Sequence, residues 1–162
     1  MDLKGVIFMY QVETVADFFL SKAAMTPKKL QKLLYYAYSW HLVLMNEDGD
    51  DLSDRLFENE LQAWVHGPVV PEIYFKYREH GRNNIDQKES FDADKAFDSD
   101  TIDVLEQVWE VYGHYNGNEL ESISHQEEPW IEGRGDCGPI DICRTAIKDE
   151  TIFETYGARL EG

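Results

Sequence analysis

The chain has 162 residues, and its 43% hydrophobic and 13% aromatic content is typical of a single folded domain. Its formal net charge is −17, from 32 acidic against 15 basic residues, and this excess repels nucleic-acid phosphates and the headgroups of anionic lipids. The composition therefore argues against direct binding to nucleic acid or to a membrane, and it favours basic proteins as partners.

The N-terminal residues 1–9 are expected to form an appendage, followed by one domain over residues 10–162. The apolar run at 6–10 is too short for the core of a signal peptide or for a membrane span. Two cysteines, Cys137 and Cys143, are too few for a disulfide-rich secreted scaffold and do not form a close metal pair, so we expect reduced thiols. These features predict a cytoplasmic protein.

Helical periodicity dominates the first 45 residues. An amphipathic helix is predicted over 12–24, and a second over 26–45, where Thr26 suits the N-cap and Pro27 the first helical position. The second helix is apolar almost all round, which indicates either the central helix of the core or a helix partly covered by another protein. The acidic stretch at 46–60 lacks the glycine and glutamate register of a calcium-binding EF-hand, so a solvated loop is expected.

The stretch AWVHGPVVPEIY, at residues 63–74, predicts a rigid corner between an extended segment and a helix. Gly67-Pro68 is expected to stop the extended segment at 61–65, and Pro71 to open a helix that Gly81 ends. Phe75 is expected on the polar side of that helix. Its predicted buried stripe consists of Val70, Ile73, Tyr74 and Tyr77. The sequence leaves open whether the peptide bonds before Pro68 and Pro71 are cis or trans.

The second half of the chain alternates between polar loops and helices. An irregular arm is expected over 82–100, followed by a helix that begins at 98 or 99 and ends near 113. A shorter helix is predicted to start at Asn118, with Glu121 completing a capping box, and to stop before Pro129. A last helix is predicted over 149–156. The fold class is therefore mainly α, a compact single-domain helical fold with at most a short β element before the Gly67-Pro68 corner.

Motifs for catalysis are scarce in the sequence. It contains no glycine-rich phosphate loop, no nucleophile elbow around a serine and no paired-histidine zinc motif. His66, and His125 among Glu121, Glu127 and Glu128, offer at best a general acid and base or a hydrolytic metal site. Because acidic residues are abundant, these histidines have carboxylate neighbours by chance. We therefore predict no catalytic residue, no metal and no cofactor.

Three segments in this order resemble a known family. They are KLQKLLYYAYSWH at 29–41, LQAWVHGPVVPEIY at 61–74 and LESISHQEEPW at 120–130, and the block AW-x-x-GPV-x-P-x-x-Y is the most specific part. Together they are similar to the Panacea domain, the SocA and GepA-like antitoxin family that is also labelled a phage-associated protein. The resemblance covers residues 10–157. The matching positions are Lys32, Leu33, Tyr35, Tyr36, Ala63, Trp64, Gly67, Pro68, Val69, Tyr74, His125, Glu128, Pro129 and Trp130.

The resemblance implies a mainly helical antitoxin that neutralises a cognate toxin by direct binding. We expect the acidic surface to steer toward a toxin with a basic nucleic-acid- or nucleotide-binding site and to occlude it. Delivery of the toxin to a protease, and metal-dependent hydrolysis, are the alternatives. A homodimer and a heterotetramer with the toxin are both compatible with the sequence, which does not determine the stoichiometry. The predicted partner-binding residues are Lys32, Tyr35, Tyr36, Trp64, His66, Pro68, Val69, Tyr74 and Phe75.

Overall fold

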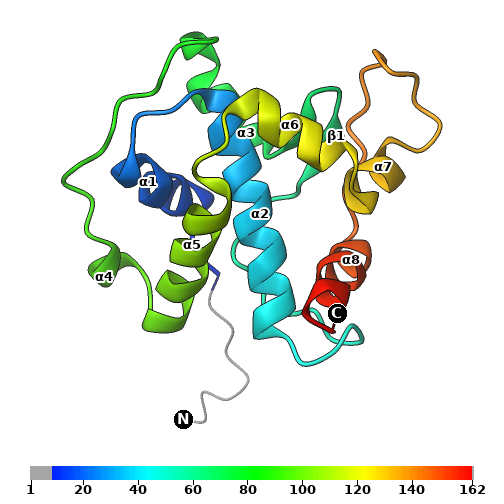
Figure 1. Ribbon diagram of the computed structural model, residues 1–162, viewed down its shortest axis with the longest axis horizontal. Coiled ribbons are helices and arrows are strands. Elements are labelled where there is room, and N and C mark those ends of the chain that lie inside the picture. Colours follow the sequence, from blue (N-terminus) through cyan, green and yellow to red (C-terminus); the bar gives the residue numbers. More distant parts are fainter. Residues whose placement is uncertain (1–8, 162) are drawn as a thin grey trace.

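The fold is built around one long helix, α2 (Pro27–Met45), which lies at the centre of the computed structural model (Figure 1). The structure describes residues 9–161. The Thr26 hydroxyl accepts the Lys29 amide at 3.2 Å and Pro27 occupies the first turn, so both predicted start signals are confirmed. Nearly every residue of α2 from Leu30 to Val43 is buried. The helix is therefore the central helix of the core, and neighbouring elements cover it on several sides.

Most of the other helices pack against α2 (Figure 1). Helices α1 (Val12–Lys22) and α5 (Ser99–Tyr112) lie on one side, and α8 (Asp149–Glu161) lies on the other. Helix α6 (Gly117–His125) crosses near the N-terminal end of α2. The capping box of α6 is formed by Asn116 and Glu119, two residues earlier than predicted. The mainly helical class is confirmed, with eight α-helices among residues 9–161.

A short hairpin replaces the single extended segment that the sequence predicted. Strand β1 (Gln62–Trp64) pairs antiparallel with β2 (Gly67–Val69), so Gly67-Pro68 begins a second strand and does not end the sheet. Gly67 has a φ of 108°, a left-handed value that favours glycine at this turn. Pro68 faces Ala63, whose amide donates instead to Thr145 O at 2.9 Å. Because this pair exchanges no ladder hydrogen bond, the missing N–H of proline is tolerated.

The predicted helix after the corner is confirmed as α3 (Pro71–Tyr77), which continues as the 3-10 helix η1 (Arg78–His80) and ends at Gly81. The irregular arm that follows contains one short helix, α4 (Ala93–Ala96). Backbone hydrogen bonds tie the arm to Met25 and Leu20, and Phe97 is buried. The arm therefore runs past α1 along the edge of the molecule and is anchored to the core at Ile85 and Phe97 (Figure 1). All described peptide bonds are trans, including those before Pro68 and Pro71.

Two features of the C-terminal third differ from the predictions. Helix α6 stops at His125, before Pro129, as predicted, but Pro129 itself lies in the first turn of a helix that was not predicted, α7 (Glu128–Arg134), where its missing N–H loses no bond. Cys137 and Cys143 form a disulfide, so the prediction of reduced thiols is wrong. The loop between them is also closed by Arg134, whose guanidinium donates to the carbonyls of Gly138 and Asp141.

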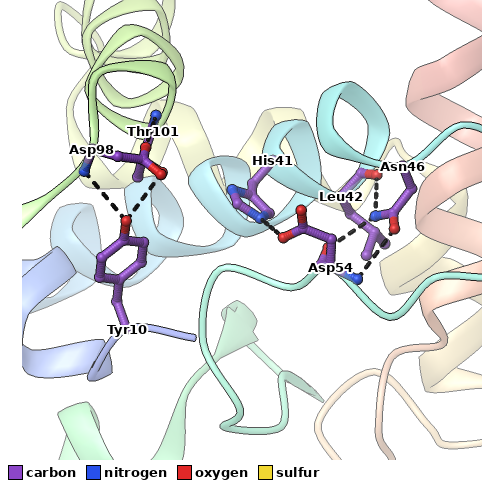
Figure 2. A network of polar contacts seen from close by, with 7 residues as sticks. All are labelled: Tyr10, His41, Leu42, Asn46, Asp54, Asp98 and Thr101. Atoms are coloured by element: carbon purple, nitrogen blue, oxygen red, sulfur yellow. Dashed lines mark hydrogen bonds and ion pairs between the residues drawn. The ribbon is translucent and has the colours of Figure 1, made fainter. Parts of the chain in front are cut away.

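A network of polar contacts fixes the segments on either side of α2 (Figure 2). The Tyr10 hydroxyl accepts the Asp98 amide at 3.3 Å, and His41 Nε2 lies 2.9 Å from Asp54 Oδ1. The Asn46 side chain donates to Leu42 O and Asp54 O and accepts the Asp54 amide. The acidic loop after α2 is therefore held at both ends.

The predicted appendage, residues 1–9, lies outside the described residues except for Met9. None of the helices between residues 9 and 161 combines the length and the hydropathy that crossing a bilayer requires.

Candidate functional site

The hairpin and the start of α3 are fixed to α2 by two buried side chains. Gln31 holds Val70 from both sides, because its amide nitrogen donates to Val70 O at 3.0 Å and its oxygen accepts the Val70 amide at 2.8 Å. Lys32 Nζ donates to Pro68 O at 3.0 Å. These bonds satisfy backbone groups that would otherwise be buried without partners. Buried hydrogen bonds therefore hold the corner against α2, and we call this part of the structure the platform.

Three aromatic side chains on this platform form a continuous group, which we call the aromatic corner: Trp64, Tyr74 and Phe75. The Trp64 and Tyr74 ring centroids are 5.0 Å apart, and those of Tyr74 and Phe75 are 5.4 Å apart. Tyr74 is 40% and Phe75 57% exposed, and the Arg78 guanidinium lies 5.4 Å from the Phe75 ring. Large exposed aromatic side chains beside an arginine are the residue types that anchor protein interfaces.

The rim beside the aromatic corner is polar and charged. His66 is exposed, and its Nδ1 lies 3.2 Å from Glu121 Oε1 on α6. Lys28 Nζ contacts the same carboxylate oxygen at 2.8 Å. Partial burial opposes ionisation of Glu121, but Lys28 and His66 together lower the pKa of this carboxyl. The three side chains form a small surface network that links the hairpin to α2 and α6.

His125 packs against Trp130, unlike the exposed His66. Its ring stacks on Trp130 with centroids 3.9 Å apart, and partial burial lowers its pKa. Trp130 Nε1 in turn donates to Trp64 O at 2.7 Å, and Arg134 donates to Ala63 O at 3.2 Å. The last motif segment thus fastens α6 and α7 to strand β1. Among the residues that the structure describes, no three His, Cys, Asp or Glu side chains converge as metal ligands would.

The nine residues predicted to bind a partner divide into a buried and an accessible set. The buried set is Lys32, Tyr35, Tyr36, Pro68 and Val69. The accessible set is Trp64, His66, Tyr74 and Phe75. Tyr74 was predicted to point inward, but it projects outward to pack against Trp64. In this conformation only the accessible set can contact another protein.

The two buried motif tyrosines belong to a hydrogen-bonded network inside the core. Tyr35 O–H and Tyr156 O–H lie 2.7 Å apart, and Tyr36 donates to Glu127 Oε1 at 2.6 Å. Tyr156 also donates to Glu127, which forms an ion pair with Arg159. Burial, followed by the nearby Glu127 charge, raises the pKa of Tyr36 far above its ordinary value. These tyrosines therefore join α2 to α7 and α8 and remain protonated.

Lys32 is a charged residue that lies almost fully buried in the platform. Its side chain is 1% exposed, and burial lowers the pKa of its ammonium to about 7, although Glu121 partly opposes the shift and Lys28 adds to it. The Cβ of an alanine at position 67 would lie 2.6 Å from Lys32 Cε. Gly67 therefore leaves room for the Lys32 side chain, which a larger residue at position 67 would displace.

Sequence reasoning missed three side chains that build the site. Gln31 lies in the first motif segment, but its bidentate contact with Val70 has no periodic signal. Arg78 follows α3 and was not associated with Phe75, because a cation over a ring depends on tertiary geometry. Glu127 was considered only as a neighbour of His125, although it stands two residues before Pro129 and is the N-cap residue of α7.

A comparison with protein families gives a match that spans the platform and α6. The family described as Antitoxin SocA-like, Panacea domain, matches residues 30–131, which is well over half of the chain. The match runs from α2 through the hairpin to α7 and includes the whole aromatic corner. Neither a curated protein nor a solved structure matches the chain. With more than half of its length matched and the three motif segments joined in one core, the chain belongs to the SocA-like antitoxin family with a Panacea domain.

Proposed function

We propose that this protein neutralises a cognate toxin by binding it directly, with the aromatic corner as the anchor of the interface. The observation that carries the proposal is the exposure of Tyr74 and Phe75 on a backbone that Gln31 and Lys32 hold in place. A fixed backbone loses little conformational entropy on binding, and exposed aromatic rings gain much from desolvation. Membership of an antitoxin-like family supports the same role.

The net charge of −17 supports occlusion as the mode of neutralisation. Toxins that act on nucleic acids or nucleotides need cationic substrate sites, and an acidic protein is steered toward such a site by long-range attraction. We propose that the aromatic corner forms the desolvated contact while carboxylates around it cover the basic cleft. Added salt is then expected to slow association much more than it speeds dissociation. Equal effects on both rates would contradict steering.

Co-expression with the toxin from the neighbouring reading frame tests the proposal. Wild-type protein should relieve growth arrest, whereas Phe75→Ser combined with Tyr74→Ser should weaken toxin binding by about a hundredfold and restore the arrest. Ile142→Ser is the matched control, because Ile142 is 84% exposed and lies in the disulfide loop. Full neutralisation by the double variant would refute the role of the aromatic corner.

The fate of the toxin separates occlusion from delivery to a protease. Occlusion leaves the toxin intact in a stable complex, so its amount should stay constant when this protein is expressed. An adaptor would instead lower the toxin level, and the level would recover in a protease-deficient host. Quantifying the toxin by immunoblot after synthesis is blocked decides between the two modes.

A further inference from the structure

A second surface is an apolar groove that shares no residue with the aromatic corner. It lies where α5 and α8 flank α2 (Figure 1) and has a volume of about 220 Å³. We call it the α2–α5–α8 groove, and its apolar lining consists of Trp40, Leu44, Val104, Val108, Val111 and Leu160. Small-molecule sites usually have volumes of about 300–1,000 Å³. The groove is therefore better matched to a few side chains of another protein than to a metabolite.

The floor and the walls of the groove differ in exposure. Val104 and Val108 form a buried floor, and the Trp40 indole N–H is satisfied by the Tyr112 hydroxyl at 3.1 Å. The walls are open, because Leu44 is 43%, Val111 54% and Leu160 58% exposed. Three large aliphatic side chains, one from each helix, thus line an open concave surface. Such a grouping differs from the single exposed apolar residues that ordinary protein surfaces carry.

The spacing of the lining residues fits a helical occupant. Val104, Val108 and Val111 stand at positions i, i+4 and i+7 of α5, so they form a ridge along one face of that helix. Leu44 and Leu160 form the opposing wall. A ridge and a groove of this kind accept the side chains of a further helix packed against them.

The unpaired charges around the groove are acidic, because the nearby cation Arg159, beside Tyr112, is paired with Glu127. Asp103 and Glu110 project from α5 beside the ridge, and both are exposed. The loop that follows α2, held by Asn46, adds four exposed carboxylates. These are Glu47, Asp48, Asp50 and Asp51. None of the six carboxylates forms an ion pair with another residue among 9–161. Unpaired acidic side chains around an apolar groove attract a cationic amphipathic segment.

We propose that the α2–α5–α8 groove docks a cationic amphipathic helix of a partner protein. Aliphatic side chains of that helix fill the groove, and its Lys or Arg side chains face Asp103, Glu110 and the loop carboxylates. A second copy of this chain is disfavoured as the occupant, because it would bring another acidic surface of charge −17 against the first. The inference does not depend on the antitoxin role of the aromatic corner.

Fluorescence anisotropy with synthetic peptides of about 18 residues tests the proposal, since helices of this length form in water. The probe places Leu at i, i+3, i+4 and i+7 and Lys at the remaining polar positions, and a matched peptide carries Glu in place of Lys. We expect the Lys peptide to bind and the Glu peptide not to bind. Leu44→Ser and Val111→Ser should each reduce affinity about tenfold. Asp103→Asn with Glu110→Gln should weaken binding more at low salt than at high salt.

Ile142→Ser is the control variant, because Ile142 is 84% exposed and belongs to neither the groove nor the aromatic corner. It should change the affinity for the Lys peptide less than twofold, about the size of a neutral surface change. Circular dichroism and the melting temperature confirm that each variant is folded. The proposal is overturned if the Lys peptide does not bind, if it binds equally to the groove variants, or if the Glu peptide binds as well. It is equally overturned if the chain dimerises and the groove variants abolish the dimer.

Discussion

The buried Lys32 ammonium makes a quantitative prediction about stability and pH. Its pKa is about 7 in the folded protein and 10.5 in the unfolded chain, so between these values the unfolded chain binds more protons. The contribution of Lys32 to stability therefore rises with pH through this window and is constant below it. With these two values, the rise between pH 7 and pH 9 is about 2 kcal/mol. Lys32→Met keeps the apolar stem but removes the titration.

The assay is urea denaturation followed by tryptophan fluorescence at several values between pH 6 and pH 10. The difference in unfolding free energy between wild type and Lys32→Met should move by about 2 kcal/mol in favour of the wild type from pH 7 to pH 9. Lys95→Met, at a side chain that is 87% exposed, serves as the control and should follow the wild-type curve. Parallel curves for wild type and Lys32→Met would show that the ammonium is hydrated and would refute the reasoning.

Two further substitutions test the packing. Gly67→Ala should destabilise the protein by about 3 kcal/mol, through its left-handed φ and its clash with Lys32, whereas Gly81→Ala, with open space around it, should lose only about 1 kcal/mol. Equal losses in urea denaturation would contradict the clash. Glu127→Gln should lose about 2–3 kcal/mol by removing the buried partner of Arg159, while exposed Glu128→Gln stays within about 0.5 kcal/mol. A thermal melt of both variants measures this difference.

Local signals account for the elements that the sequence predicted well. Thr26 and Pro27 mark the start of α2 because capping depends on neighbours only a few residues away. The boundary of α3 was predicted for the same reason, from Pro71 and Gly81. Strand β2 was missed because a Gly-Pro pair normally interrupts a strand. Only the register, in which Pro68 faces Ala63, shows that the ladder needs no N–H from Pro68.

The candidate site depended more strongly on tertiary structure. Periodicity correctly placed Phe75 on the polar side of its helix. It wrongly placed Tyr74 inward, because helical periodicity carries no information about the tertiary contact between Tyr74 and Trp64. Tyr35 and Tyr36 stand in a motif segment, yet their hydroxyls are used by Tyr156 and Glu127, which lie far away in sequence. A motif identifies which residues matter to the fold, but burial decides which of them face another protein.

The hairpin also determines how any partner can approach. Strand β1 has β2 on one side and residues 145–147 on the other, through the Ala63 amide to Thr145 O and the Ile147 amide to Leu61 O. Both of its edges are occupied, so an incoming chain cannot extend the sheet by pairing with β1. Contacts there must be made by side chains. Substitutions of these outward groups therefore change the surface of the protein while leaving the strand pairing intact.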